Sequence, residues 1–313
     1  MVKTPWRVYI EAYWLLNVWI ISDGKPGHLN QSLGLVEAMQ RLKPEAVRYQ
    51  QLPPLSVWQA LPALLTGKLS IAVDELPDLV VGAGHSTHLS LLAVGRATGA
   101  KTVVLMSPSL PLGCFDLALI PEHDNPKACA NVIPTVGALN RMLPAKEKRP
   151  DSGMLLIGGP SKHFVWDESQ VLEQVGALIK DSRRHWLLTT SRRTPDSFLT
   201  ALAKLDTGNV DVVPFAETDA KWLVKHLPEQ QVCWVTNDSV SMIYEALSAG
   251  CRVGVVELPH RAENRIVTGI SHLISRGLVA TSNDAMQATV ALHGSSFNEA
   301  QRCAQELIRL LER

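Results

Sequence analysis

Residues 232–258, VCWVTNDSVSMIYEALSAGCRVGVVEL, carry the feature that most constrains the fold. Trp234 and Val235 belong to a short apolar run, and the polar residues 236–239 that follow are typical of a helix N-terminus. Gly250 stands where helices commonly end in a left-handed residue, and residues 252–258 form a second apolar run. The segment therefore predicts a strand–helix–strand unit with short connections, which is half of a nucleotide-binding fold.

The start of this predicted helix has the features of an anion-binding site. Its first N–H groups lack helical partners, and the hydroxyls of Ser239 and Ser241 stand beside them, so it can hold a phosphate or pyrophosphate. Glu245 shares the face of Ser241 and can accept hydrogen bonds from ribose or sugar hydroxyls. Asn237 and Asp238 complete the candidate site. A plain capped helix with a surface glutamate explains the same residues equally well.

The same succession of apolar strand and polar or glycine-rich loop recurs along the chain. We expect strands at residues 18–21, 79–81, 102–106, 117–120, 154–157, 186–189, 232–235 and 252–258. Strands that alternate with helices form parallel sheets with right-handed crossovers, and ligands bind at the carboxyl ends of the strands. The predicted loops fall at those ends.

A charged, proline-bearing stretch at residues 143–150 interrupts this pattern. The length of 313 residues also favours two domains over one. We therefore expect an α/β protein of two Rossmann-like, doubly wound domains that face a cleft. The first covers residues 1–146 and the second residues 147–313, with a last helix that can pack back on the first domain.

Composition narrows the classes of function. The 30 basic and 30 acidic residues cancel without forming a basic run, which argues against nucleic-acid binding. The five cysteines contain no CxxC pair, so free thiols in a reducing cytosol are favoured over a zinc site. No Asp-x-Asp pair and no GxxxxGK[ST] loop occurs, so we expect neither a metal ion nor a cofactor.

Two segments raise the question of membrane contact. Residues 6–21 are rich in aromatic side chains but too short to span a bilayer, which takes roughly 20 apolar residues. Residues 1–14 are an interfacial anchor, an extra strand or an unpacked extension. Residues 55–69 place Trp58, Leu61, Leu64 and Leu65 on neighbouring turns, where core packing is favoured over contact with a membrane surface or lipid-linked substrate.

Four ordered motifs carry a family resemblance. They are DGKPGH at residues 23–28 with Asn30-Gln31, IGGPS at 157–161, TTSRRTP at 189–195 and TNDSVSM at 236–242. Together they resemble the ELM1-like family over roughly residues 17–277. That family includes bacterial proteins of uncertain role and a plant mitochondrial-fission factor. It is similar in fold to GT-B glycosyltransferases, such as the enzyme that adds N-acetylglucosamine to lipid-linked peptidoglycan precursors.

The resemblance implies a metal-independent transfer of sugar from a nucleotide-sugar to an envelope lipid or saccharide acceptor. His28, at the end of a glycine loop, is then the leading candidate for the base, and Asp23 is an alternative base or the group that orients His28. The further candidates stand in other predicted strand-end loops: His85, His88, His123 and Asp124. The expected acceptor residues are Gly24, Lys25, Gly27, Gly84, His85 and His123.

On the donor side, Gly158 and Gly159 allow close approach of a phosphate, and Ser161 can cap the segment that follows. Arg193 is favoured over Arg192 as a phosphate ligand, since adjacent side chains on an extended segment point apart. Residues 260–264 either reach the sugar or form an exposed polar loop.

Two other functions stay open. One is a nucleotide-sugar epimerase or hydrolase on the same fold, which needs the diphosphate site but no large acceptor. The other is a non-catalytic adaptor like the plant relative. In each case we expect a cytoplasmic protein, free or peripheral to the inner membrane.

Overall fold

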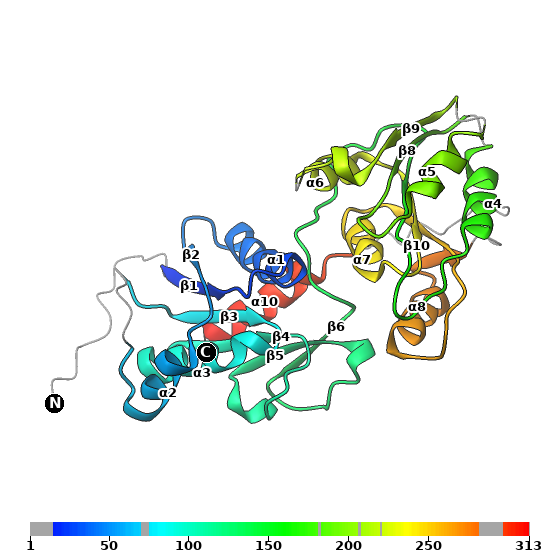
Figure 1. Cartoon of the computed structure of the whole chain (residues 1–313). Helices are drawn as coiled ribbons and strands as arrows, with labels where there is room; N and C mark the ends of the chain where they lie inside the picture. The colour runs from blue at the N-terminus through cyan, green and yellow to red at the C-terminus, as the bar shows by residue number, and fades with distance from the viewer. Residues whose placement is uncertain are drawn as a thin grey trace. The chain divides into compact units, whose positions relative to one another are not determined.

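The computed structural model describes residues 15–69, 75–180, 183–205, 208–219, 221–281 and 297–312 (Figure 1). The alternatives for residues 1–14 lie outside these ranges. The chain forms two six-stranded sheets, with strand orders β2-β1-β3-β4-β5-β6 and β12-β11-β10-β7-β8-β9. Helices connect the strands of each sheet, so both parts of the chain have the expected α/β architecture.

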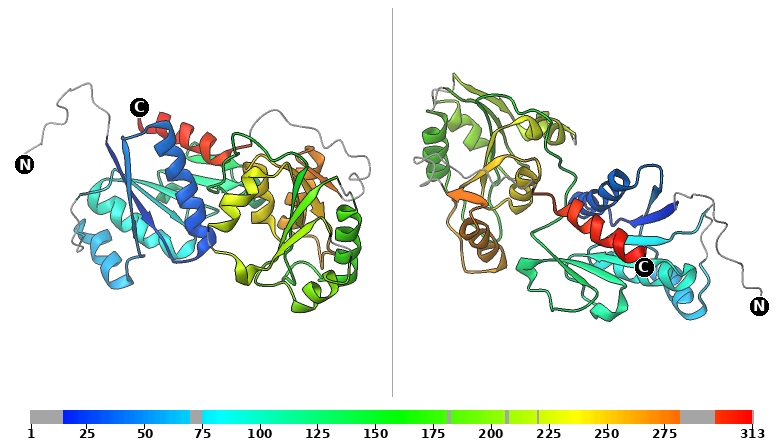
Figure 2. Two further views of the ribbon diagram at one scale, coloured as in Figure 1. Left: turned by 90° about the horizontal axis from the view of Figure 1, so that it is seen from above. Right: turned by 180° about the vertical axis from the view of Figure 1, so that it is seen from behind.

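The first sheet contains β1 (Leu16–Ile21), β2 (Val47–Leu52), β3 (Leu79–Ala83), β4 (Lys101–Leu105), β5 (Leu117–Pro121) and β6 (Val132–Thr135). Its α-helices are α1 (Pro26–Leu42), α2 (Val57–Thr66), α3 (His88–Thr98) and the C-terminal α10 (Glu299–Leu311). Short 3-10 helices follow as η1 (His85–Thr87), η2 (Leu112–Cys114) and η3 (Glu122–Asp124). The pairings from β2 to β5 are parallel. Helices α1 and α10 lie on one face of this sheet, and α2 and α3 on the other (Figures 1 and 2).

The second sheet contains β7 (Ser152–Leu156), β8 (His185–Thr189), β9 (Val210–Val213), β10 (Val232–Thr236), β11 (Arg252–Val256) and β12 (Val279–Thr281). Its helices are α4 (Glu168–Ile179), α5 (Asp196–Leu202), α6 (Trp222–His226), α7 (Val240–Ser248) and α8 (Arg265–Ser275), with η4 (Phe215–Glu217) and η5 (Leu227–Glu229). All pairings in this sheet are parallel.

The eight strands expected from the sequence occupy the interior of the two sheets. Interior parallel strands are buried on both faces and therefore consist of continuous apolar runs, such as residues 18–21 in β1 and 79–83 in β3. The sequence pattern did not reveal β2, β6, β9 and β12, which are the sheet-edge strands of the described structure. These four carry partly exposed or polar residues, as in VRYQQL of β2.

The chain separates into two compact units. One comprises residues 1–119, 129–133 and 303–313, and the other comprises residues 120–128 and 134–302. The C-terminal part of α10 thus groups with the first sheet, and the loop after β5 groups with the second. The division between the sheets falls between β6 and β7, where the charged stretch at residues 143–150 lies.

Two local expectations need correction. Helix α1 begins at Pro26, a residue suited to the first helical position, so His28 lies in its first turn and not at the end of a loop. The second expectation, that the apolar residues of 55–69 pack in the core, holds for some of them only. Leu64 packs partly buried against the small α2–α3 core, but Trp58 is 88% exposed and Leu65 is 77% exposed. Within the described ranges, no helix has the length and apolar character that a membrane span requires.

Candidate functional site

In the first unit, loops from neighbouring strands bring Asp23, His28 and Ser86 together. The Nδ1 atom of His28 lies 3.1 and 3.0 Å from the two carboxylate oxygens of Asp23. The Ser86 hydroxyl donates to Oδ2 of Asp23 at 2.9 Å. Asp23 follows β1 and Ser86 follows β3, which pairs with β1. The adjacency of these two strands therefore builds the cluster.

The Asp23 carboxylate is held ionised. Its side chain is only 6% exposed, and this burial by itself raises the pKa. Hydrogen bonds from Ser86, from the Lys25 backbone N–H and from His28 outweigh burial and lower the pKa of Asp23 from 3.8 to about 2. The carboxylate thus favours the His28 tautomer with the proton on Nδ1. Nε2 of His28 has no hydrogen-bond partner among the described residues, and the side chain is 20% exposed. This nitrogen is available as a base.

Gly84 packs directly against the His28 ring. It adopts a φ of +85°, and a side chain at this position would overlap the imidazole. Gly24 also has a positive φ, of +78°, and shapes the turn before α1. Lys25 places its ammonium 3.4 Å from Asp23. Gly27 lies in the first turn of α1, and His85 is exposed on η1. Five of the six expected acceptor residues therefore surround or flank the Asp23–His28 pair.

In the second unit, three strand-end loops meet at Arg193 and Asp238. The Arg193 guanidinium lies 2.6 Å from Oδ2 of Asp238. It also donates to the carbonyls of Gly159 and Pro160, both at 3.1 Å, and to the Ser239 hydroxyl at 3.2 Å. These residues follow β8, β10 and β7 at the carboxyl edge of the sheet. Arg192 diverges from its neighbour and lies 5.9 Å over the Phe215 ring.

Gly158 and Gly159 admit protein atoms where side chains would otherwise stand. A side chain at Gly158 would overlap the Asp238 carboxylate and the Ser239 hydroxyl, and one at Gly159 would overlap the Arg193 backbone. The Thr194 hydroxyl bonds the Gly158 carbonyl and ties the loops after β7 and β8 together. The glycine pair is thus required by the packing of the loops on one another.

Asp238 acts as an internal anion in this cluster. Its side chain is fully buried, and Oδ2 accepts from Gly159 N–H at 3.2 Å, from Ser239 Oγ at 3.2 Å and from Arg193. Its Oδ1 is buried with no hydrogen-bond partner in the described part of the chain. The donors that remain open are the Val240 and Ser241 N–H groups, for which the described residues provide no acceptor. They lie at the start of α7, with the exposed Ser241 hydroxyl beside them.

The remaining expected donor residues have different surroundings. Both polar atoms of the Asn237 amide bond the Leu258 backbone, at 3.1 and 3.0 Å, so this side chain clamps β10 to the end of β11. The Ser161 hydroxyl accepts from the Phe164 N–H at 3.1 Å and shapes its own turn. Glu245 is half-buried on α7, one turn beyond Ser241. The sequence pattern did not distinguish these roles because the partners are distant in the chain.

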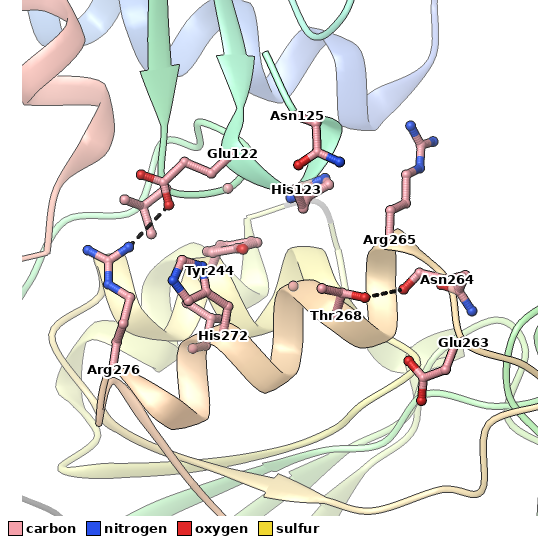
Figure 3. A pocket seen from close by; sticks show the side chains of 14 residues that line it. Glu122, His123, Asn125, Tyr244, Glu263, Asn264, Arg265, Thr268, His272 and Arg276 are labelled. Carbon is pink, nitrogen blue, oxygen red and sulfur yellow. Dashed lines mark hydrogen bonds and ion pairs between the residues drawn. The ribbon is translucent and has the colours of Figure 1, made fainter. Parts of the chain in front are cut away.

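His123, the sixth expected acceptor residue, lies elsewhere. It lines a pocket of about 800 Å³ in the second unit, together with residues of η3, α7 and α8 (Figure 3). Arg276 pairs with Glu122 at 3.1 Å and Arg265 with Asp124 at 2.6 Å, which attaches η3 to α8. Figure 3 shows Tyr244 between these two elements. Among residues 260–264, Asn264 uses its Oδ1 to cap α8.

Burial sets the protonation of two groups in this pocket. It raises the pKa of Tyr244 to about 12, so the phenol stays neutral and can donate a hydrogen bond. Burial also lowers the pKa of His123, although the nearby Asp124 carboxylate partly opposes this shift. The pocket therefore offers neutral donors and acceptors between two arginine–carboxylate pairs.

Sequence reasoning missed Ser86, Thr194 and Tyr244. Ser86 and Thr194 stand in loops that follow predicted strands, which is where a ligand site is expected. Their partners, Asp23 and Gly158, follow other strands, so the local pattern does not show these contacts. Tyr244 lies within the helix predicted in residues 232–258, and no local pattern distinguishes it from its neighbours. Within the described ranges, no cluster of three or more His, Cys, Asp or Glu side chains is arranged to hold a metal ion.

Comparisons with known proteins place the chain in a family. The family model described as mitochondrial fission ELM1 matches residues 26–311. An uncharacterized protein of Rickettsia prowazekii (strain Madrid E) is 22% identical, and the alignment covers 93% of this chain and 97% of the relative.

Solved structures share the fold at low identity. The UDP-GlcNAc 2-epimerase from Methanocaldococcus jannaschii is 11% identical with a TM-score of 0.59, covering 95% of this chain and 99% of that one. MurG from Acinetobacter baumannii is 13% identical with a TM-score of 0.52, with coverage of 95% and 99%. MnaA from S. aureus, solved with UDP, is 12% identical with a TM-score of 0.55, with coverage of 95% and 96%. The fold is thus the two-domain, Rossmann-like GT-B type shared by glycosyltransferases and epimerases. On the match over residues 26–311, the chain belongs to the mitochondrial fission ELM1 family.

Proposed function

We propose that this protein is a glycosyltransferase that moves a sugar from a nucleotide-sugar to an envelope lipid or saccharide acceptor, without a metal ion or cofactor. The observation that carries the proposal is the meeting of three strand-end loops at Arg193, beside the open N–H groups of α7. The open N–H groups of the helix N-terminus and the Ser241 hydroxyl supply the donors that a leaving diphosphate needs. The exposed Arg193 guanidinium, held by Asp238 and Ser239, lies beside them. Glu245 then accepts from a ribose hydroxyl.

The first unit supplies the base. Nε2 of His28 removes the proton from the acceptor hydroxyl as the oxygen attacks the sugar carbon and the bond to the diphosphate breaks. The Asp23 carboxylate accepts a hydrogen bond from the Nδ1–H group of His28 and stabilises the imidazolium that forms. Hydrogen bonds from Ser86 and the Lys25 backbone keep this carboxylate ionised. Gly24, Gly27, Gly84 and His85 form the surroundings in which the acceptor binds.

A nucleotide-sugar epimerase or hydrolase is the second candidate. It is favoured by the similarity to UDP-GlcNAc 2-epimerases, which includes a TM-score of 0.59. A histidine held by a buried carboxylate is also suited to removing a proton from a sugar carbon. The hydrolase transfers the sugar to water and releases the nucleotide, whereas the epimerase gives back an isomeric nucleotide-sugar, so neither needs a large acceptor.

Nucleotide binding is the first test. We expect UDP or another nucleoside diphosphate to raise the melting temperature, and Arg193→Gln to weaken its binding by roughly tenfold or more, because a charge-assisted contact contributes about 1.5–3 kcal/mol. Arg192→Gln is the matched control, since the neighbouring arginine lies over Phe215 and should bind nucleotide like the wild type. Failure of every nucleotide to shift the melting temperature would argue against both enzymes and favour an adaptor.

Turnover is the second test. His28→Ala should lower kcat by about 10²–10⁴ while leaving nucleotide affinity nearly unchanged, because general base catalysis contributes a factor of that size. Release of UDP should depend on added acceptor for a transferase. Release at full rate without acceptor would instead identify the hydrolase, and conversion of the nucleotide-sugar to its epimer without net release of UDP would identify the epimerase.

A further inference from the structure

Helix α2 of the first unit presents a stripe of large apolar side chains to solvent. Trp58 is 88% exposed, Leu65 77%, Val57 54% and Leu61 48%. Positions 57, 61 and 65 recur at four-residue spacing and so share one face of the helix, with Trp58 beside it. We refer to these four residues as the α2 face. Trp58 is the most exposed large apolar side chain in the described ranges.

The packing of α2 explains why this face is left open. Its other side carries Ala60 and Ala63, which are buried against Ala93 of α3. Small residues at this contact bring the two helices close together and leave the larger side chains of α2 on the outside. The helix is therefore apolar on both its buried and its exposed side, whereas an ordinary surface helix has polar residues outside. Contiguous exposed apolar surface of this kind marks an interaction site.

The charge of the α2 segment itself is basic and lies at its C-terminal end. Residues 53–69 contain no acidic residue and a single cation, Lys68. The backbone carbonyl of Arg96 on α3 lies next to Gly67, the C-terminal cap of α2. Arg96, an exposed residue, also lines a surface hollow with Leu64, Lys101 and Asp116. Neither Lys68 nor Arg96 has an ion-pair partner among the described residues, whereas the nearby Lys101 is paired with Asp116 at 2.9 Å. Two unpaired cations beside an apolar stripe complement an anionic lipid surface.

The start of α2 lies close to the proposed base. Strand β2 ends at Leu52, whose carbonyl accepts from the Ser22 N–H at 2.9 Å, and Ser22 precedes Asp23. Only residues 53–56 separate Leu52 from the first residue of α2. The α2 face and the Asp23–His28 pair thus begin at the same edge of the first sheet.

We propose that the α2 face docks on an anionic lipid bilayer, with Trp58 and Leu65 in the interface and Lys68 and Arg96 against the head groups. Docking would bring the edge that carries His28 to a membrane-borne acceptor. The link to the acceptor rests on the proposed function. The docking itself is a property of this face and can be measured without nucleotide.

The test is flotation of the full-length protein with vesicles of phosphatidylcholine, with and without phosphatidylglycerol. We expect binding that increases with the anionic lipid. Trp58→Ser with Leu65→Ser should reduce it by roughly tenfold or more, since two large side chains lose their apolar burial. Val224→Ser with Leu310→Ser is the matched control, because these side chains are 44% and 45% exposed on other helices. The control variant should bind like the wild type.

A second pair of substitutions tests the charges. Lys68→Gln with Arg96→Gln should reduce binding to vesicles containing phosphatidylglycerol by roughly tenfold or more, and should leave weak binding to pure phosphatidylcholine unchanged. Circular dichroism of each variant checks that the fold is kept.

Three results would overturn the proposal. The first is that the wild type does not float with either vesicle. The second is that the variant with Trp58→Ser and Leu65→Ser floats as well as the control variant. The third is that sedimentation equilibrium shows a dimer and that this variant dissociates it. The last result would assign the face to a second copy of the chain. Since none of these measurements uses a nucleotide, they stand apart from the thermal-shift and turnover tests of the proposed function.

Discussion

At the scale of single residues, Gly84 controls the position of His28. It has a φ of +85°, and any side chain there would overlap the imidazole. Gly84→Ala should therefore destabilise the first unit by about 1–3 kcal/mol and displace His28, lowering kcat. Gly99→Ala is the control, because Gly99 has a similar φ of +79° and a methyl group there would meet no other atom within 4 Å. Urea unfolding and turnover of both variants check this; equal losses would show backbone strain alone.

Asp23 predicts a specific dependence of stability on pH. Its pKa falls from 3.8 to about 2 in the folded protein, so the ionised carboxylate stabilises the fold above 3.8. This contribution disappears as the pH falls from 3.8 to about 2. In Asp23→Asn the free energy of unfolding should decline less over that interval than in the wild type. Urea unfolding at a series of pH values measures the difference, and parallel curves would contradict the assignment.

The two adjacent arginines show which side-chain contacts the sequence predicts and which it does not. Alternation on an extended segment predicts that Arg192 and Arg193 point apart. The two side chains do diverge, but both residues lie in a turn after β8 and not in an extended segment. The pattern does not reveal that Arg193 is held by Asp238, which lies 45 residues further along the chain. Such a pair depends on the order of the strands in space.

At the scale of elements, the cap of α8 can be tested directly. Oδ1 of Asn264 accepts from the N–H groups of Ile266 at 2.9 Å and Val267 at 3.3 Å. Asn264→Ala should lower the free energy of unfolding by about 1 kcal/mol, since it leaves two helix N–H groups without this acceptor. Asn264→Asp keeps the acceptor and adds a charge that suits the helix start, so it should retain the stability. Urea denaturation distinguishes them. Equal losses would assign the effect to the Asn264 Nδ2 donor, which bonds the Ala262 carbonyl at 2.9 Å, and unchanged stability of Asn264→Ala would show that the cap does not matter.

The strands illustrate which elements a sequence reveals. Interior strands such as β10 are buried on both faces, so uninterrupted apolar residues predict them. Edge strands such as β2 and β9 have one free side and carry arginine, glutamine or aspartate, which obscures the pattern. Helix α2 shows the converse error. Its apolar residues predict burial, yet its packing against α3 buries alanines and exposes Trp58.

At the scale of the whole molecule, the two compact units predict separable unfolding. Each unit contains its own sheet and a buried core, so calorimetry should show two transitions. A nucleoside diphosphate should raise the temperature of the transition that belongs to the second unit, because a ligand stabilises the part that binds it. Arg193→Gln should remove that shift. A single transition that moves as a whole would contradict independent units.

The sequence by itself determined the α/β class, the interior strands of both sheets and the polar loops that end them. These features depend on local periodicity and capping, which neighbouring residues carry. Only the tertiary structure decided which loops meet, that Asp238 occupies the donors around Arg193, that Ser86 reaches Asp23, and that the α2 face is exposed. Strand order and helix packing decide these contacts. Both arise from the burial of surfaces far apart in the chain, which a local pattern does not encode.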